Sequence, residues 1–566
     1  MSPTPTSPDR TLPATGHPTL AAALDAAAQQ PTGLNIYGLR GELVEAVPYA
    51  GLRERALALA GRLQASGLAP GDRVGLVAET SATFVTSFFA CQYAGLVPAP
   101  MPLPAPLGGG DAYVDQIARL LTQAHASAAF GPEALQPLVA AAGARAGLRQ
   151  LAPLAELPKG EVERVEATPE DTCYLQFSSG STRTPTGVVV THRAVRANAH
   201  AITRHGLAIG AGDRAFSWLP LFHDMGLVGF LLSPLTVAMS VDLMPSDAFV
   251  RRPLLWPRLI GQTGATISYS PSFGYELCAR RAETADLSDL DLSRWRVAGV
   301  GGDMVRAGPL TAFADRFAAS GFDARAFVAS YGMAEATLAL AMSPLGQGVR
   351  KEILASDRLE RGGRAVAGAG YARRRDFVRC GPVLPGHELE VRDEAGAPLP
   401  DRHLGRIFVR GPSLMRGYFD QPDATSAVLG VDGWLDTGDL GFLADGELTP
   451  TGRAKDLILH NGRNIWPQDL EWTAEAEIVG LRSGDVAAFQ AEEDGPGVIA
   501  LVQTRVRDPA ARARLAADIA GLLRARHGVE TEVRLVGPGA LPQTSSGKLR
   551  RARARELFLV GAFETA

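Results

Sequence analysis

The segment YLQFSSGSTRTPTGVVVTH, residues Tyr174–His192, decides the fold of this chain. It begins with apolar residues typical of a buried strand and continues into a turn rich in glycine and hydroxyl side chains. Hydroxyl and backbone N–H groups donate to phosphate oxygens, and glycine lets the backbone approach a charged ligand closely. The spacing of a Walker A loop is absent. The segment therefore predicts a phosphate-binding loop of another kind, and a Ser/Thr-rich surface turn is the alternative. The predicted cradle consists of Ser178, Ser179, Gly180, Ser181 and Thr182.

On either side of this loop, helical patterns alternate with short Val/Ile/Leu runs bounded by glycine and proline. Residues 72–80 read as a strand, and residues 81–95 have helical spacing. Such alternation predicts an α/β fold with largely parallel strands. Residues 96–110 hold several prolines, which remove backbone donors and fix φ, so we expect a loop there.

Length and composition limit the class of protein. A single core stops growing at about 250–300 residues, so a chain of 566 residues predicts at least two domains. With 46% hydrophobic residues and a net charge of −4, the chain is typical of a globular protein and shows no sign of a nucleic-acid partner. The cysteines form no CxxC pair, which argues against disulfides or a zinc site and fits the cytoplasm. They are Cys91, Cys173, Cys278 and Cys380.

The uncharged run at residues 225–241 raises the question of a membrane span. A span needs about 20 apolar residues, whereas this run is shorter, contains Pro234 and has an aspartate at each end. We therefore expect a buried wall and no membrane span.

Changes in composition suggest domain boundaries. Residues 1–18 are rich in Pro, Thr and Ser and read as a flexible tail rather than a signal peptide. Residues 19–452 would form a large N-terminal domain, in which the charged, glycine-rich stretch 351–379 reads as a surface insertion. A hinge is expected near 453–455, followed by a small, Arg-rich domain at 456–566.

Further segments repeat, in order, the motifs of one superfamily. Together with SSGSTRTPTG they are LFHDMGL (221–227), SYGMAEATL (330–338), GWLDTGDLG (433–441), GRAKDLILHNGRNIWPQDLE (452–471) and PQTSSGKLRR (542–551). This series resembles the acyl-adenylate-forming superfamily of acyl-CoA synthetases, peptide-synthetase adenylation domains and luciferases. The resemblance covers about residues 45–555. It implies a large multi-subdomain adenylation domain with parallel and mixed sheets and helices, followed by a small mobile α+β lid domain.

The resemblance also implies roles for single residues. Lys548 would reach from the lid to the carboxylate and the α-phosphate, and Glu335 and Thr182 would hold Mg²⁺. His223 would line the entrance between the acid pocket and ATP, and Lys455 would be the hinge residue. ATP or AMP would contact the cradle and the following residues: Arg183, Gly301, Gly302, Asp303, Ser330, Tyr331, Gly332, Met333, Ala334, Asp439 and Arg453. For each of these residues, an ordinary structural or solvated role is the alternative.

The expected chemistry is electrostatic. A carboxylic acid with a pKa near 4 is ionised at pH 7, so it can attack the α-phosphate of ATP without a general base. The difficulty is that an anion must approach another anion and pyrophosphate must leave, so positioning and positive charge should dominate catalysis. ATP and Mg²⁺ are the expected cofactors.

Details of the motifs resemble one branch, the fatty-acyl-AMP ligases. Arg183 stands where CoA-using synthetases usually have glycine, and Thr186 stands where they usually have lysine. The segment 268–281 resembles that branch's acid pocket, and 351–379 lies where the branch carries an insertion. A long alkyl chain needs a long apolar tunnel, because each buried CH₂ contributes about 0.8 kcal/mol. The expected wall residues are Trp218, Met225, Gly226, Leu227, Phe230, Phe273 and Tyr275.

The branch implies an acceptor other than CoA. Its insertion hinders the domain rotation that CoA chemistry needs, and the acyl group goes to the phosphopantetheine thiol of an acyl carrier protein, as in polyketide or nonribosomal peptide pathways. A basic run that includes Arg551 could steer an acidic carrier, or it could be a solvated face. The alternatives are a long-chain fatty-acyl-CoA synthetase and a non-catalytic acyl-AMP-binding scaffold. We expect a monomer.

Overall fold

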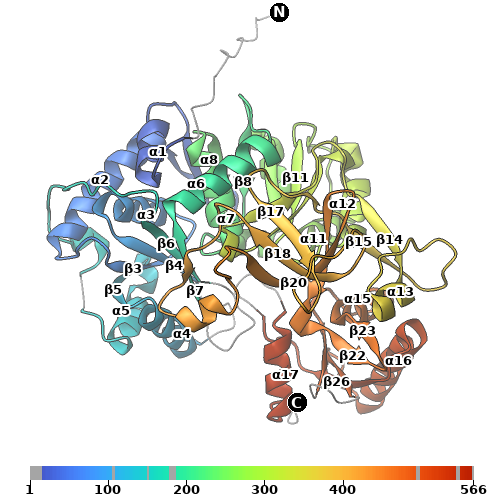
Figure 1. Ribbon diagram of the computed structural model, residues 1–566. Coiled ribbons are helices and arrows are strands. Elements are labelled where there is room, and N and C mark those ends of the chain that lie inside the picture. The colour runs from blue at the N-terminus through green and yellow to red at the C-terminus, as the bar shows by residue number, and fades with distance from the viewer. Residues whose placement is uncertain are drawn as a thin grey trace, which may run out of the picture.

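An eight-stranded sheet forms the centre of the N-terminal part of the computed structural model, which describes residues 16–104, 109–149, 152–177, 186–491, 497–543 and 549–563 (Figure 1). In spatial order its strands are β13 (Ala339–Met342), β12 (Phe327–Gly332), β11 (Val297–Val300), β10 (Ile267–Ser270), β8 (Arg214–Ser217), β9 (Ser240–Leu243), β1 (Gly33–Tyr37) and β2 (Leu43–Pro48). Pairing is parallel from β12 to β1 and antiparallel at both ends. The α/β prediction is confirmed.

Helices with apolar faces pack around this sheet and share its core. They are α1 (Leu20–Ala27), α2 (Tyr49–Ala65), α3 (Ala82–Ala94), α6 (His192–His200), α9 (Ser246–Arg251), α10 (Leu255–Thr263), α11 (Ser272–Ala282) and α12 (Ala307–Phe317). Helix α3 has the helical spacing predicted for residues 81–95. Ser81 caps it by accepting from the N–H of Phe84, and Gly95, with φ of 69°, ends it.

A second layer consists of two small sheets beside the first. One is the parallel sheet β4 (Val97–Met101), β3 (Arg73–Val77) and β5 (Ala126–Phe130). The other is the antiparallel sheet β19 (Gly417–Tyr418), β7 (Gly187–Thr191) and β6 (Thr172–Phe177). Helices α4 (Gly110–Gln123) and α5 (Gln136–Arg145) pack on this layer. Strands β6 and β7 thus flank the predicted phosphate loop.

The loop predicted over residues 96–110 was wrong in its first half. Val97–Met101 is strand β4 at the end of its sheet, where Pro98 pairs with Val74 and Pro100 with Leu76. Because the two prolines are two residues apart, both missing N–H groups lie on the side away from β3, and the ladder with β3 stays intact. Proline is tolerated in such an edge strand although it excludes a helix.

The uncharged run at residues 225–241 is an internal wall, as predicted. It forms α7 (Asp224–Leu227), the π-helical segment η4 (Val228–Leu232), α8 (Ser233–Thr236) and the start of β9. Nearly all of these side chains are buried. A second π-helical segment, η3 (Ala201–Gly206), continues α6. Among the residues that the structure describes, no helix has both the length and the apolar character that a bilayer crossing requires.

An antiparallel five-stranded sheet follows along the chain. Its order is β16 (Gly381–Pro382), β21 (Glu447–Arg453), β20 (Leu435–Ala444), β18 (Gly405–Arg410) and β17 (Glu388–Arg392). The short helix α14 (Pro422–Ser426) precedes β20.

The stretch 351–379, predicted to be a surface insertion, consists largely of regular elements. Strand β14 (Lys351–Ala355) pairs antiparallel with β15 (Arg374–Val378), and helix α13 (Ser356–Gly362) lies between them in sequence. We call residues 351–378 the insertion hairpin. Leu354, Leu359 and Phe377 are buried in a cluster with Phe442 of β20 and with Trp466, which precedes α15. The charged residues hid these few apolar positions in the sequence.

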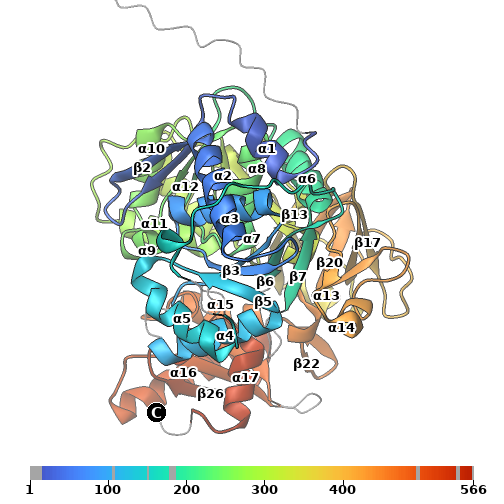
Figure 2. The ribbon, with the colours of Figure 1, turned by 90° about the vertical axis from the view of Figure 1, so that its left-hand side faces the viewer.

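The elements after Asp456 have hydrophobic clusters of their own. They are β22 (Ile458–His460), β23 (Arg463–Ile465), α15 (Pro467–Glu477), β24 (Val486–Gln490), β25 (Val498–Gln503), α16 (Pro509–His527), β26 (Thr531–Val536) and α17 (Arg551–Leu559). We call them the C-terminal unit. They lie together at the bottom of Figures 1 and 2, and α13 of the insertion hairpin lies beside β23.

Candidate active site

A cavity of about 900 Å³ lies between the N-terminal part and the C-terminal unit. Its lining combines the ends of β6 and β7, the loop after β11, the end of β12, strands β20 and β21, and the start of α17. Most of the predicted nucleotide-site residues that the structure describes line it: Gly302, Asp303, Ser330, Tyr331, Gly332, Met333, Ala334, Glu335, Asp439 and Arg453. Gly301 is buried beside the lining, where an added Cβ would lie 2.8 Å from Oγ of Ser330. Ser178–Thr182, Arg183 and Lys548 are outside the described residues.

Tyr331 and Asp439 join the two main sheets at the cavity. The hydroxyl of Tyr331, at the end of β12, donates to Oδ2 of Asp439 on β20 at 2.8 Å. The register of β20 and β21 places Arg453 opposite Asp439, with Nε 3.5 Å from Oδ1. Burial raises the pKa of Asp439, and the charge of Arg453 opposes that rise. A carboxylate held this way keeps acceptor capacity toward the cavity and could bind a diol.

Glu335 is a buried carboxylate at the same cavity. Its Oε1 accepts from the hydroxyl of Tyr418 at 2.9 Å, and its carbonyl oxygen accepts from the N–H of Met415 at 2.7 Å. Burial raises the pKa of Glu335. Mg²⁺ is commonly held by one or two carboxylates together with waters and substrate phosphates. Glu335 therefore fits a Mg²⁺ ligand. Among the residues described, no group of three or more His, Cys, Asp or Glu side chains forms a metal cage.

The backbone next to Glu335 is strained. Thr337 has φ of 69° and ψ of −57°, and the N–H of Leu338 donates to the carbonyl of Ala336 at 2.8 Å. These values describe a γ-turn of the rare, strained form, which is unusual for a β-branched residue. The hydroxyl of Thr337 donates to the carbonyl of Ser413 at 2.7 Å and helps to hold the turn. Strain of this kind persists only where the surroundings fix it.

His223 lies at the cavity wall beside Asp224, with its Nδ1 2.6 Å from Oδ1 of that residue. The N–H of Met225 also lies 3.4 Å from Nδ1. Nearby, the side-chain amide of Gln176 donates to the carbonyl of Phe222 at 2.8 Å. His223 thus lines the cavity together with both polar and apolar residues, and its role as a gatekeeper stays a prediction.

The apolar lining residues include members of both π-helical segments. Ile202 and Leu207 from η3 and its end, and Gly229 and Phe230 from η4, line the cavity together with Tyr269, Leu338, Ala339 and Met342. Segments of π-helix are rare and frequently occur at functional sites. These lining side chains are uncharged and mostly apolar, which suits an alkyl chain.

The predicted tunnel residues divide into two groups. Met225 and Phe230 line the cavity. Trp218, Gly226, Leu227, Phe273 and Tyr275 are outside its lining. Trp218 stacks on Phe249 at 3.8 Å between ring centroids, and the buried hydroxyl of Tyr275 donates to the carbonyl of Gly299 at 2.8 Å. Trp218, which directly follows β8, and Tyr275, which lies on α11, are both buried in the core of the N-terminal part.

The C-terminal unit contributes cations to the cavity. Lys455, Arg550, Arg551 and Arg553 line it, and Gln543 and Leu549, which flank residues 544–548, do so as well. Arg551 is 17% exposed and donates to Glu471 at 2.6–2.7 Å, with Asp456 at 3.2 Å. It is therefore an internal ion-pair residue and not part of a basic face that could steer a partner.

Several cavity residues were missed by sequence reasoning. Tyr418 and Gln468 carry no charge and lie outside the phosphate-loop pattern, yet both line the cavity. Arg406 and Asp436, which pair at 2.6 Å, were missed as well, although Asp436 lies within the GWLDTGDLG motif.

Comparison with known proteins identifies the family, since residues 25–419 match the AMP-binding enzyme family. The chain belongs to the AMP-binding enzyme family. It is 60% identical to a putative acyl-CoA synthetase of Caulobacter vibrioides, over 99% of this chain and 98% of the relative. It is 32% identical to the long-chain-fatty-acid–AMP ligase FadD32 of Mycolicibacterium smegmatis, over 91% of this chain and 89% of the relative.

Two further matches narrow the activity within this AMP-binding family. The chain is 31% identical to JamA of Moorena producens, a medium-chain-fatty-acid–[acyl-carrier-protein] ligase, over 92% of this chain and 91% of the relative. A solved structure from a study of fatty acyl-adenylate ligases of E. coli and L. pneumophila matches with a TM-score of 0.94 and 43% identity, covering 98% of this chain and all of that one. The AMP-binding chain is thus an enzyme that joins an acid to AMP, and ATP supplies the AMP.

Proposed function

We propose that this enzyme converts a long-chain fatty acid and ATP to fatty acyl-AMP and pyrophosphate, and then transfers the acyl group to an acyl carrier protein. A carboxylate oxygen attacks the α-phosphorus, and the bond to pyrophosphate breaks. The phosphopantetheine thiolate then attacks the acyl carbonyl, and AMP leaves. Lys548 would donate to the carboxylate and the α-phosphate in the first step, Glu335 would hold Mg²⁺, which would supply positive charge for the phosphates, and Asp439 would bind the ribose.

The observation that carries the choice of acceptor is a bridge between the insertion hairpin and the C-terminal unit. Glu360 of α13 accepts from Nε of Arg463 on β23 at 2.9 Å, and both side chains are at most 10% exposed. Arg375 of β15 pairs with Asp469 of α15 at 2.7 Å. The Arg375 guanidinium also lies over the rings of Phe377 and Trp466, at 4.2 and 4.6 Å from their centroids.

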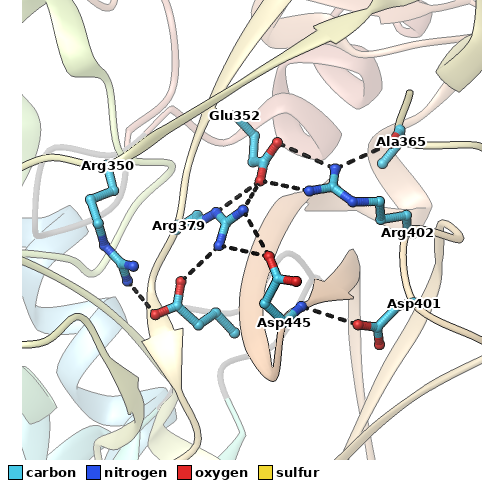
Figure 3. Close-up of polar contacts among 8 residues, drawn as sticks. Arg350, Glu352, Ala365, Arg379, Asp401, Arg402 and Asp445 are labelled. Carbon is cyan, nitrogen blue, oxygen red and sulfur yellow. Dashed lines mark hydrogen bonds and ion pairs between the residues drawn. The ribbon is translucent and has the colours of Figure 1, made fainter. Parts of the chain in front are cut away.

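The other end of the hairpin is bonded to the N-terminal part. Figure 3 shows Arg379 between Glu352 at the base of the hairpin and Asp445 in the turn between β20 and β21. Arg379 also pairs with Glu447 at 3.1 Å, and Arg402 contacts Glu352 at 3.3 Å. The hairpin therefore contacts the N-terminal part at its base and the C-terminal unit at its other end, so it connects the two sides of the hinge proposed at Lys455.

Ion pairs that cross the proposed hinge favour an acyl carrier protein over CoA as the acceptor. Full rotation of the C-terminal unit would separate Arg463 from Glu360 and Asp469 from Arg375, and the docked arrangement would lose the interactions of these buried pairs. An acceptor that needs this rotation is disfavoured. A carrier protein brings its own binding surface and can offset part of the cost.

Purified enzyme tests the proposal with fatty acids of graded chain length. We expect acid-dependent release of pyrophosphate that is greatest for long chains, followed by acylation of a holo-acyl carrier protein and little acyl-CoA. Formation of acyl-CoA at the rate of adenylation would refute the choice of acceptor. A lack of pyrophosphate release with every acid would refute the activity itself and favour a non-catalytic scaffold.

A fatty-acyl-CoA synthetase is the second candidate, and the 60% identical relative, a putative acyl-CoA synthetase, favours it. The same assay separates the two candidates. Replacing both Glu360 and Asp469 with alanine adds a second test. If the bridge restrains the C-terminal unit, acyl-CoA formation should rise in this variant while pyrophosphate release stays unchanged.

A further inference from the structure

The cations at the cavity differ in whether a carboxylate already neutralises them. Arg406 pairs with Asp436 at 2.6 Å, and Arg453 lies 3.5 Å from Asp439. Arg551 is bound by Glu471 and Asp456, and Arg553 pairs with Glu556 at 2.9 Å. Within the described part of the chain, this leaves Lys455 and Arg550 as cavity-lining cations without a carboxylate partner.

Arg550 is the more confined of these two cations. Lys455 is exposed, whereas Arg550 is half-buried. The Nε atom of Arg550 is fully buried and has no hydrogen-bond partner among the residues described. A buried guanidinium nitrogen without an acceptor is costly, and such a group usually meets a ligand or water. The backbone N–H of Arg550 donates to the carbonyl of Pro542 at 2.9 Å and fixes the start of this segment.

Thr186, the described end of the phosphate-loop segment, lines the cavity and has no charge. A triphosphate and a fatty carboxylate together bring several negative charges into one partly enclosed space. Guanidinium groups bind phosphate oxygens in a bidentate manner, and they stay charged when buried.

We propose that Arg550 binds the β- and γ-phosphates of ATP and steadies the departing pyrophosphate. The proposal rests on the proposed adenylation activity. It assigns opposite roles to two adjacent arginines. Arg551 links α17 to α15 through Glu471 and to the hinge segment through Asp456. Arg550 lines the cavity, and its positive charge is available to a ligand there.

The test separates ligands that have these phosphates from those that lack them. Arg550→Ala should raise the KM for ATP and weaken inhibition by pyrophosphate roughly ten- to a hundredfold, as expected for a lost hydrogen bond to a charged group. Binding of an acyl-sulfamoyl-adenosine, which has no β- or γ-phosphate, should change less than about twofold. Arg550→Lys should fall between parent and alanine variant. Arg524→Ala, which removes an exposed arginine paired with Glu530, is the matched control.

Each remaining outcome is informative. An unchanged KM for ATP in Arg550→Ala overturns the proposal. Slower transfer from preformed acyl-AMP to the carrier, with normal pyrophosphate exchange, also overturns it and places Arg550 at the acceptor side. Loss of acyl-sulfamoyl-adenosine binding assigns the residue a structural role instead. If the parent enzyme catalyses no pyrophosphate exchange with any acid, the proposed adenylation activity is refuted, and the role of Arg550 that rests on it is refuted as well.

Discussion

Replacing Glu360 with alanine should release the C-terminal unit from the insertion hairpin. Glu360 is 5% exposed and accepts from Arg373 at 2.7 and 3.0 Å and from Arg463 at 2.9 Å. Its loss leaves the buried guanidinium group of Arg463 without its main acceptor, whereas the partly buried Arg373 keeps Asp357 at 2.7 Å. Breaking a buried pair in this way costs about 3–5 kcal/mol. The undocked arrangement does not bear this cost, because Arg463 can then be hydrated.

The expected shift in the equilibrium between docked and undocked C-terminal unit can be measured directly. A cost of about 3 kcal/mol lowers the ratio of docked to undocked molecules roughly a hundredfold. Dyes on Val431→Cys and Val479→Cys would report it by single-molecule energy transfer, since both positions are fully exposed and the native cysteines are buried. Asp357→Ala is the control, because Asp357 contacts the same Arg373 but is 57% exposed, so its loss should cost less than about 1 kcal/mol. Equal energy transfer in parent, control and Glu360→Ala would refute the reasoning.

A double-mutant cycle with Arg463→Ala adds a second test. In the double variant the docked fraction should be partly restored relative to Glu360→Ala, because no unpaired Arg463 remains.

Three further changes test the site and the C-terminal unit. Asp439→Asn should raise the KM for ATP about tenfold and leave the KM for fatty acid unchanged, as steady-state kinetics can check, because it removes one charged acceptor. Tyr418→Phe removes the hydroxyl that donates to Glu335 and should lower kcat about fivefold without a change in melting temperature. A lower melting temperature together with the lower kcat would indicate misfolding instead. Burial and the charge of Glu471 raise the pKa of Glu475 to about 8. The folded chain therefore binds more protons than the unfolded chain between about pH 4.5 and 8, and stability falls with rising pH there. Glu475→Gln removes this fall, so the melting temperature of the variant minus that of the parent should rise from pH 5 to 8 and then level off; a constant difference would contradict it.

Sequence motifs could select polar residues that share one cavity, because each motif combines a glycine with a polar side chain at a fixed offset. The structure brings Asp303, Tyr331 and Asp439 to one cavity although they are far apart in sequence. The apolar half could not be predicted in the same way. A buried aromatic residue such as Trp218 has the same sequence signature whether it faces a cavity or packs on Phe249.

Two elements show why local patterns failed elsewhere. Pro98 and Pro100 exclude a helix, but only the pairing partner decides between a loop and an edge strand. In the insertion hairpin, charged residues such as Glu360 and Arg375 suggested an exposed surface. Their partners, Arg463 and Asp469, lie in the C-terminal unit, so their burial depends on a contact that no single segment encodes.

The γ-turn at Thr337 sets a limit on how far this enzyme can be made more heat-resistant without loss of turnover. Glycine adopts positive φ without strain, so Thr337→Gly would relieve about 1–3 kcal/mol at this position, partly offset by the greater entropy of the unfolded chain. The same change removes the hydroxyl that ties the turn to Ser413 and gives the neighbouring Glu335 carboxylate more freedom. Random selection for thermal tolerance should therefore favour substitutions at this turn, and assays of the survivors should find them slower, which is the usual trade between stability and activity.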